Sequence, residues 1–524
     1  MRLSLLPLET SRPNRRSFLA ATTSLAAAAL WSNRAEGAVR RNVKLTDTPF
    51  ALGVASGDPW PTGVVLWTRL APQPLAGGGM GEEAVEVGWE VAEDEGFTKI
   101  VRHGKTTAVP DWAHSVHVEV EGLAPARTYF YRFHAAGEAS PIGRTRTTPP
   151  ADSLPEKLRF AFASCQHYET GYFTPYEHMV KDDLDLVVHL GDYLYEGKAT
   201  QNSVRQHVGP EIESLADYRN RHAQYKTDPA LQAAHAAFAW LVTWDDHEFD
   251  NNCAGAISEQ PNVRSEDFLQ RRARAYQAYY EHMPLRRTSL PQGPDMQLYR
   301  RIVFGRLAEF FVLDTRQYRS DQPCGDGKKR QCAEALDPRQ SLLGDGQEKW
   351  LRDGMSRSTG RWNVLAQQVM MARVDRTAGD EIAYSMDQWP GYEMNRRRLL
   401  KFFDERKISN PVVLAGDIHS NWANDLIADF DELDSKVVAT EFVGTSISSG
   451  GDGTRQPRDL DRLLAENPFV KFHTAERGYI RCTATPGQWR SDYQAVEYVT
   501  RPGAPAITRA SFVVEDGKPG LQSV

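Results

Sequence analysis

Four short apolar runs in this chain each lead into residues that can bind a metal ion, and this pattern constrains the fold more than any other. The runs cover 158–164, 184–191, 238–243 and 411–416. They are rich in β-branched residues and bounded by Gly or Pro, which favours buried strands over helices. Since open α/β sheets place their sites beyond the carboxyl ends of strands, we expect the four ends to meet at one edge.

The residues after these runs are of the metal-ligand types. Cys165 follows the first run, Asp192 the second and Asp417 the fourth. The third leads into WDDHEFDNN (244–252), which holds four carboxylates, a histidine and two carboxamides. An isolated acidic cluster is usually a solvated turn, but four such strand ends together indicate a centre with several metal ions.

The motifs resemble a variant of the metallophosphoesterase pattern GD…GNH(D/E)…GHxH. The chain has GD at 191–192, DDHE at 245–248 and GDIH at 416–419. It departs from the pattern where Ser164-Cys165 stands in place of DxH, and where Tyr195 follows the GD aspartate. These departures resemble the PhoD-type alkaline phosphatases.

Four further segments carry the same resemblance: 54–59, 65–69, 314–319 and 441–446. The resemblance implies a metallophosphoesterase-like α/β domain over 155–515, a two-sheet sandwich with outer helices. An all-β, fibronectin-like sandwich is expected before it, over 46–148, because strands there alternate with period two and 123–132 resembles a tyrosine corner. Helices are predicted over 265–280, with a serine cap, and over 395–406.

The resemblance implies one Fe(III) and two Ca(II) ions. Thiolate and phenolate are strong donors to Fe(III), whereas Ca(II) prefers carboxylate and carboxamide oxygens. Matching motif positions assigns Cys165, Tyr195 and His419 to iron and makes Asp192 a bridge to calcium. The further calcium ligands expected are Asp246, Asn252 and Asp417.

Three residues are candidates for contact with the substrate. His247 is expected to bind it or to protonate the leaving group. Arg316 and Tyr318 follow the apolar run 307–313 and are expected at the phosphate oxygens, since the planar fork of Arg suits phosphate. A surface ion pair is the open alternative for Arg316. Metal ions activate water for attack on phosphorus, so the chain needs no nucleophilic serine.

The first 38 residues resemble a twin-arginine (Tat) signal that the Tat translocase would recognise. Arg15-Arg16-Ser17-Phe18-Leu19 precedes an alanine-rich apolar run over 20–30. This run is shorter than the roughly 20 residues that span a bilayer, so cleavage is expected and no stable membrane anchor. The predicted location is periplasmic or secreted. There Cys324 and Cys332 are expected to form a disulfide, the alternative being a free pair.

These features together predict a secreted, metal-dependent alkaline phosphatase that acts on phosphate monoesters. The net charge of −7 argues against a nucleic-acid-binding role, which needs a basic face. Three alternatives stay open. They are a phosphodiesterase or phospholipase D-like hydrolase, a purple acid phosphatase, and a catalytically dead exported binding module.

Overall fold

The computed structural model describes residues 47–377 and 379–524, so the predicted Tat signal lies outside the described residues. All four apolar runs form strands: β9 (Leu158–Ala163), β10 (Leu186–His189), β11 (Ala239–Val242) and β17 (Pro411–Ala415). The first three are parallel neighbours in one sheet. β17 lies in a second sheet. The expectation of a single sheet edge is therefore corrected, since the four ends meet where two sheets pack together.

Antiparallel strands extend the first sheet beyond β9. They are β21 (Val470–Ala484), β22 (Gln488–Val496), β23 (Ala506–Glu515) and β24 (Lys518–Ser523). The second sheet contains β12 (Arg300–Phe304), β13 (Ala308–Val312), β15 (Trp362–Ala366), β17, β19 (Val437–Val443) and β18 (Asn421–Ile427). β21 belongs to both sheets, because its first part pairs with β18 and its last part with β9.

The strands bury both of their faces, as strands covered by helices do. On β9, Phe160 points between the two sheets, where it meets Phe310 of β13 edge-on at 5.3 Å between ring centres. Its neighbour Ala161 points to the helices outside. On β17, Leu414 and Val413 divide in the same way between the inner core and the outer helices. The alternation explains why the runs are continuously apolar.

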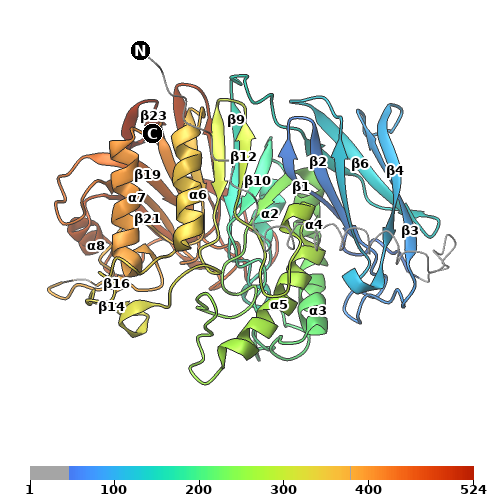
Figure 1. Cartoon of the computed structure of the whole chain (residues 1–524), viewed down its shortest axis with the longest axis horizontal. Helices are drawn as coiled ribbons and strands as arrows, with labels where there is room; N and C mark the ends of the chain where they lie inside the picture. The colour runs from blue at the N-terminus through green and yellow to red at the C-terminus, as the bar shows by residue number, and fades with distance from the viewer. Residues whose placement is uncertain (1–46, 378) are drawn as a thin grey trace, which may run out of the picture.

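Helices cover the outer face of each sheet (Figure 1). The first sheet carries α2 (Thr174–Met179), α3 (Leu215–Lys226), α4 (Pro229–Ala237) and α5 (Ser265–His282). The second carries α6 (Gly344–Arg357) and α7 (Glu393–Glu405), and the short helix α8 (Leu460–Glu466) precedes β21. The helix predicted at 265–280 is confirmed, but Arg264 occupies its cap position and no side chain caps it. None of the helices in the described part of the chain could cross a membrane.

The N-terminal part is all-β, as predicted. One of its sheets contains β3 (Val85–Ala92), β4 (Ile100–Ala108), β6 (Thr128–Ala135), β7 (Glu138–Ala139) and β8 (Gly143–Arg146). Facing it are β1 (Val54–Trp60), β2 (Gly63–Arg69) and β5 (Ser115–Glu121). The tyrosine corner is present, since the backbone N–H of Ala124 donates to the hydroxyl of Tyr129 at 2.9 Å. The fold class predicted from the sequence is confirmed.

One sheet of the sandwich is continuous with the first sheet of the α/β part. β1 pairs in parallel with β11, placing Ser56 opposite Ala239 and Gly57 opposite Trp240. In Figure 1, β1 and β2 lie beside the central strands of the α/β part. The bounds predicted for the two domains, 46–148 and 155–515, stay predictions, and hydrogen bonding joins the two parts into one sheet.

Candidate metal centre

The side chains of the site stand on turns that directly follow the strands. Cys165, Asp192, Asp417 and His419 have φ of +58°, +56°, +67° and +52°. Residues other than Gly rarely adopt this left-handed region, and such strain gathers at functional sites, where the surrounding structure fixes it. The backbone at each strand end is thus held so that its side chain turns toward the centre.

Two glycines allow the strand ends to come close. A Cβ on Gly416 would lie 2.3 Å from the Ser164 Oγ, where the second sheet approaches the first. Gly191 has φ +109°, and a Cβ there would lie 2.5 Å from the backbone nitrogen of Asp245. Any larger residue at either position would push two of the ligand-bearing turns apart.

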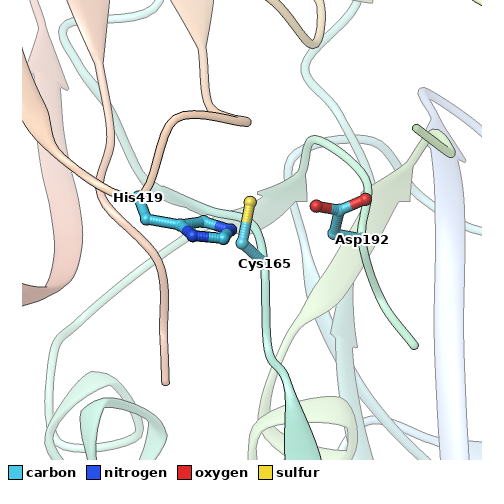
Figure 2. Close-up of side chains that lie close together, drawn as sticks. All are labelled: Cys165, Asp192 and His419. Carbon is cyan, nitrogen blue, oxygen red and sulfur yellow. The ribbon is translucent and has the colours of Figure 1, made fainter. Parts of the chain in front are cut away.

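Three overlapping groups of potential metal ligands lie at these strand ends. Within each group the ligand atoms are all within 4.8 Å of one another. The groups are Cys165, Asp192 and His419; Asp192, Asp246 and His247; and Asp245, Asp246 and Asp417. Figure 2 shows the first, with the imidazole of His419 and the carboxylate of Asp192 on either side of the Cys165 sulfur. Because Asp192 and Asp246 each belong to two groups, the three form one continuous centre.

The acidic groups at the centre are buried and crowded together. Burial, together with Asp246 and other neighbouring carboxylates, raises the pKa of Asp192 well above its usual value, even with His247 close by. Burial and the charge of Asp192 likewise raise the pKa of the Cys165 thiol. The Oδ1 atoms of Asp192 and Asp246 are buried and have no hydrogen-bond partner among the described residues. Buried polar atoms without hydrogen bonds are costly, so these oxygens fit metal ligation, although Arg316 forms an ion pair with Asp246 Oδ1 at 3.5 Å.

Tyr195 joins the first group, as the sequence predicts. Its hydroxyl donates to Asp192 Oδ2 at 3.0 Å and lies 3.1 Å from His419 Nε2. Ser449 Oγ lies 2.8 Å from the same hydroxyl and 2.7 Å from the carbonyl oxygen of Cys165. The structure therefore brings Cys165, Tyr195 and His419 together around Asp192, and their assignment to iron stays a prediction.

Of the predicted calcium ligands, Asp246 and Asp417 lie in the third group. Asn252 lies beside them, because its backbone N–H donates to Asp246 Oδ2 at 2.7 Å. Gln388 donates to Asp417 Oδ2 at 3.0 Å. All the residues predicted as calcium ligands are thus gathered in one region.

Arg316 is fully buried and joins the acidic groups, so it is not the surface ion pair that the sequence left open. It donates to Asp245 and makes two parallel bonds to Asp387, at 2.8 and 3.0 Å. Its Nη2 also lies 3.5 Å from Asp246 Oδ1. In this arrangement Arg316 holds carboxylates in place. Tyr318 packs its ring edge-on against Tyr299, at 5.5 Å between centres.

His247 lies at the open side of the centre, with 22% of its side chain exposed. Its Nδ1 is 2.7 Å from Glu196 Oε2, so Nε2 is the nitrogen left for a substrate or a metal ion. Burial alone lowers the pKa of His247, but Glu196, Asp192 and Asp246 outweigh burial and hold it well above its usual value. The ring of His247 packs on the ring of Tyr195 at 4.1 Å.

Several residues that support the site were missed from the sequence. Glu248 accepts the backbone N–H groups of Asp192, Tyr193 and Asp245 at 2.7–3.0 Å and so ties two strand ends together. His167 places its ring 4.3 Å from that of Tyr195. Glu248 belongs to the DDHE motif and His167 lies two residues after Cys165, so their positions in the sequence could have indicated them. Asp387 and Gln388 follow only the two-residue strand β16 (Tyr384–Ser385), and nothing in their spacing points to the site.

Two packed sheets with a thiol, imidazoles and carboxylates gathered at the strand ends define a metal-dependent hydrolase of the metallophosphoesterase kind. The profile of the PhoD-like phosphatase family matches residues 160–493, and that of the PhoD-like phosphatase N-terminal domain matches residues 35–149. The chain belongs to the PhoD-like phosphatase family, whose members are phosphoric ester hydrolases. This membership sets aside the purple acid phosphatase alternative.

Two relatives are similar over nearly the whole chain. Alkaline phosphatase D of Bacillus subtilis (strain 168) is 51% identical over 520 residues, which cover 98% of this chain and 89% of that protein. A solved structure of PhoD superimposes with a TM-score of 0.90 at 53% identity, over 92% of this chain and 93% of that chain.

Proposed function

We propose that this chain is an exported, metal-dependent alkaline phosphatase that hydrolyses phosphate monoesters by attack of water. The observation that carries the proposal is the continuous centre of three overlapping ligand groups, in a chain of the PhoD-like phosphatase family. Export rests on the twin arginines of the first 38 residues and would place the enzyme in the periplasm or the medium.

Fe(III) and Ca(II) fit the donors of the centre. Cys165, Tyr195 and His419 would hold iron, and Asp192 has an unpaired buried oxygen with which to bridge to calcium. The residues that would hold calcium are Asp246, Asn252 and Asp417. When bound, the ions supply positive charge to an anionic ester and lower the pKa of water.

The residues of the chain orient this chemistry. Arg316 balances part of the charge of Asp245, Asp246 and Asp387, and its paired bonds to Asp387, at 2.8 and 3.0 Å, have the fork geometry of charge-assisted pairs. His247, fixed through Nδ1 by Glu196, presents its other nitrogen at the open side, where a leaving-group oxygen would accept a proton.

Metal exchange tests the proposal directly. Removal of calcium from the mature protein should lower hydrolysis of a phosphomonoester at least about 100-fold while iron stays bound, because hard oxygen ligands hold calcium more weakly than the thiolate side holds iron. Returning calcium should restore the rate, and zinc should not. Full recovery with zinc, with calcium inert, would show an ordinary binuclear centre instead.

Diester cleavage is the alternative within the same chemistry. The apolar segment Trp389–Tyr392 is buried, so it provides no apolar surface for a lipid. A panel of monoesters, nucleotide diesters and phospholipids would separate the two activities. Loss of all activity in a protein that has its full complement of metals would instead favour the binding-module alternative.

A further inference from the structure

A loop closed by a disulfide forms one wall of the calcium side of the centre. Cys324 and Cys332 are bonded, as the sequence predicts. Inside the loop, β14 (Lys328–Lys329) pairs with β16 (Tyr384–Ser385). The carbonyl oxygen of Gly327 also accepts the N–H of Met386 at 2.9 Å. The loop is therefore fastened to the segment that leads into Asp387 and Gln388.

Asp326, within this loop, contacts a predicted calcium ligand. Its Oδ2 accepts a hydrogen bond from Asn252 Nδ2 at 2.8 Å. The backbone N–H of Asn252 in turn donates to Asp246 Oδ2 at 2.7 Å. The remaining oxygens of the two carboxylates, Oδ1 of Asp246 and Oδ1 of Asp326, are buried without hydrogen-bond partners among the described residues.

We propose that Asp326, held by the Cys324–Cys332 disulfide, is a positioning residue that sets the calcium affinity of the centre by fixing the carboxamide of Asn252. A carboxamide binds calcium only through its oxygen. An ionised carboxylate can accept hydrogen bonds but cannot donate them. Asp326 therefore keeps Nδ2 of Asn252 facing itself, and Oδ1 of Asn252 faces away from Asp326. Such outer partners orient ligands and tune affinity in metal sites generally.

The backbone of the loop has a conformation that the disulfide would help to hold. Four successive residues, 324–327, have φ between +59° and +75°. For Cys324 and Asp326 this conformation is disfavoured and persists only when the surrounding structure imposes it. The cross-link restricts the loop, so opening it should release Asp326 from Asn252.

This inference rests on the proposed iron–calcium centre, so its test reads calcium binding rather than hydrolysis. Calcium is titrated calorimetrically into iron-loaded protein freed of calcium. Asp326→Asn should weaken calcium binding roughly 10- to 100-fold, the usual effect of losing an outer partner. Iron content and the visible absorption of the iron should not change. Asp326→Glu should recover part of the affinity, and Asp321→Asn, at an exposed carboxylate three residues before the loop, should match the unmodified protein.

Opening the disulfide gives a second measurement that needs no substitution at Asp326. A dithiol reductant supplies two electrons and two protons, yields the two thiols and is itself oxidised to a cyclic disulfide. Reduced protein, and the Cys324→Ser/Cys332→Ser double variant, should show weaker calcium binding in the same direction. If Asp326→Asn and the reduced protein both bind calcium within twofold of the affinity of the unmodified protein, the inference about Asp326 is overturned and the proposed function is not. Unmodified protein that binds no calcium would overturn the proposed function as well.

Discussion

At the scale of single residues, the centre brings together donor atoms of different chemical types. Aspartates supply most of the oxygen atoms of the centre. Close to Asp192 lie a thiol, a phenol and an imidazole, from Cys165, Tyr195 and His419. Zinc sites are usually formed by Cys, His and carboxylate ligands without a phenol, and calcium sites by oxygen ligands without a thiol. The donor set therefore supports the proposal that this centre holds two kinds of metal ion.

Replacing Cys165 tests the iron side. Cys165→Ser should lose most bound iron and the visible charge-transfer colour, and hydrolysis should fall at least about 100-fold, since the thiolate is the strongest donor of the set. Metal analysis and the absorption spectrum check this. Cys482→Ser is the matched control, because Cys482 is also buried and free but lies in β21 between the sheets. Unchanged iron content in Cys165→Ser would remove the residue from the ligand set.

At the scale of elements, the approach of β17 to β9 shapes the centre. The missing side chain of Gly416 lets the end of β17 pass Ser164, and the next residue of each turn, Asp417 and Cys165, is a predicted ligand. Ser164 also bridges to Ser446 beyond β19. The two sheets are thus tied together at the end where the chemistry lies.

Gly416→Ala should force these two strand ends apart. Overpacking of this kind costs about 1–3 kcal/mol, and the larger effect should be on metal content, because the turns carrying Cys165 and Asp417 must move. Ser164→Gly in the same chain removes both atoms nearest the new Cβ and should restore metal binding. Thermal unfolding and metal analysis of both single variants and of the double variant would check this. Equal defects in Gly416→Ala with and without Ser164→Gly would contradict the steric explanation.

The sequence predicted the strands that end at the centre, because buried parallel strands leave a plain apolar signal and ligands follow at their ends. It did not predict Asp387 and Gln388, which lie on an irregular segment and reach the site only through tertiary contacts with Arg316 and Asp417. The predicted contact of Arg316 with phosphate oxygens stays a prediction, and the carboxylates around Arg316 come from three separate loops, which carry Asp245 and Asp246, Asp387, and Asp417. The pairing of β1 with β11 joins distant residues that carry no mutual signal.

Across the whole molecule, burial of basic groups links stability to pH. Lys226 is buried at the end of α3, and its nearest polar partner is His235 Nε2 at 3.4 Å. Its ammonium lies 4.4 Å from the ring centre of Trp67. Burial lowers the pKa of Lys226 from 10.5 to about 7. Between these two values the unfolded chain binds the proton and the folded chain does not, so stability should rise as the pH rises.

Lys226→Met should remove this dependence. The variant should be more stable than the unmodified protein at pH 7, by an amount on the order of a few kcal/mol, and the difference should shrink toward pH 9.5. Denaturant unfolding at several pH values measures it. A stability difference that stays constant between pH 7 and pH 9.5 would show that Lys226 titrates in the folded protein as it does in the unfolded chain.

The proposed export concerns the whole chain. Arg15→Lys with Arg16→Lys should leave the precursor in the cytoplasm, because the twin arginines are what the Tat translocase reads in such signals. Fractionation of cells and the size of the protein in each fraction check this, with Arg34→Lys, downstream of the apolar run, as the control. Normal secretion of the double variant would show that another route carries the protein.

The pairing of β1 with β11 has a consequence for the order of folding. During synthesis β1 emerges early, but the strand that covers one of its edges is made only after the whole sandwich and the first strands of the α/β part. Until then that edge is open to pairing with other chains, which is a hazard for a nascent protein. The sheet of the sandwich that contains β1 is therefore completed only after residues 239–242 have been made, and translocation of finished, folded protein suits such a chain better than threading it through a membrane unfolded.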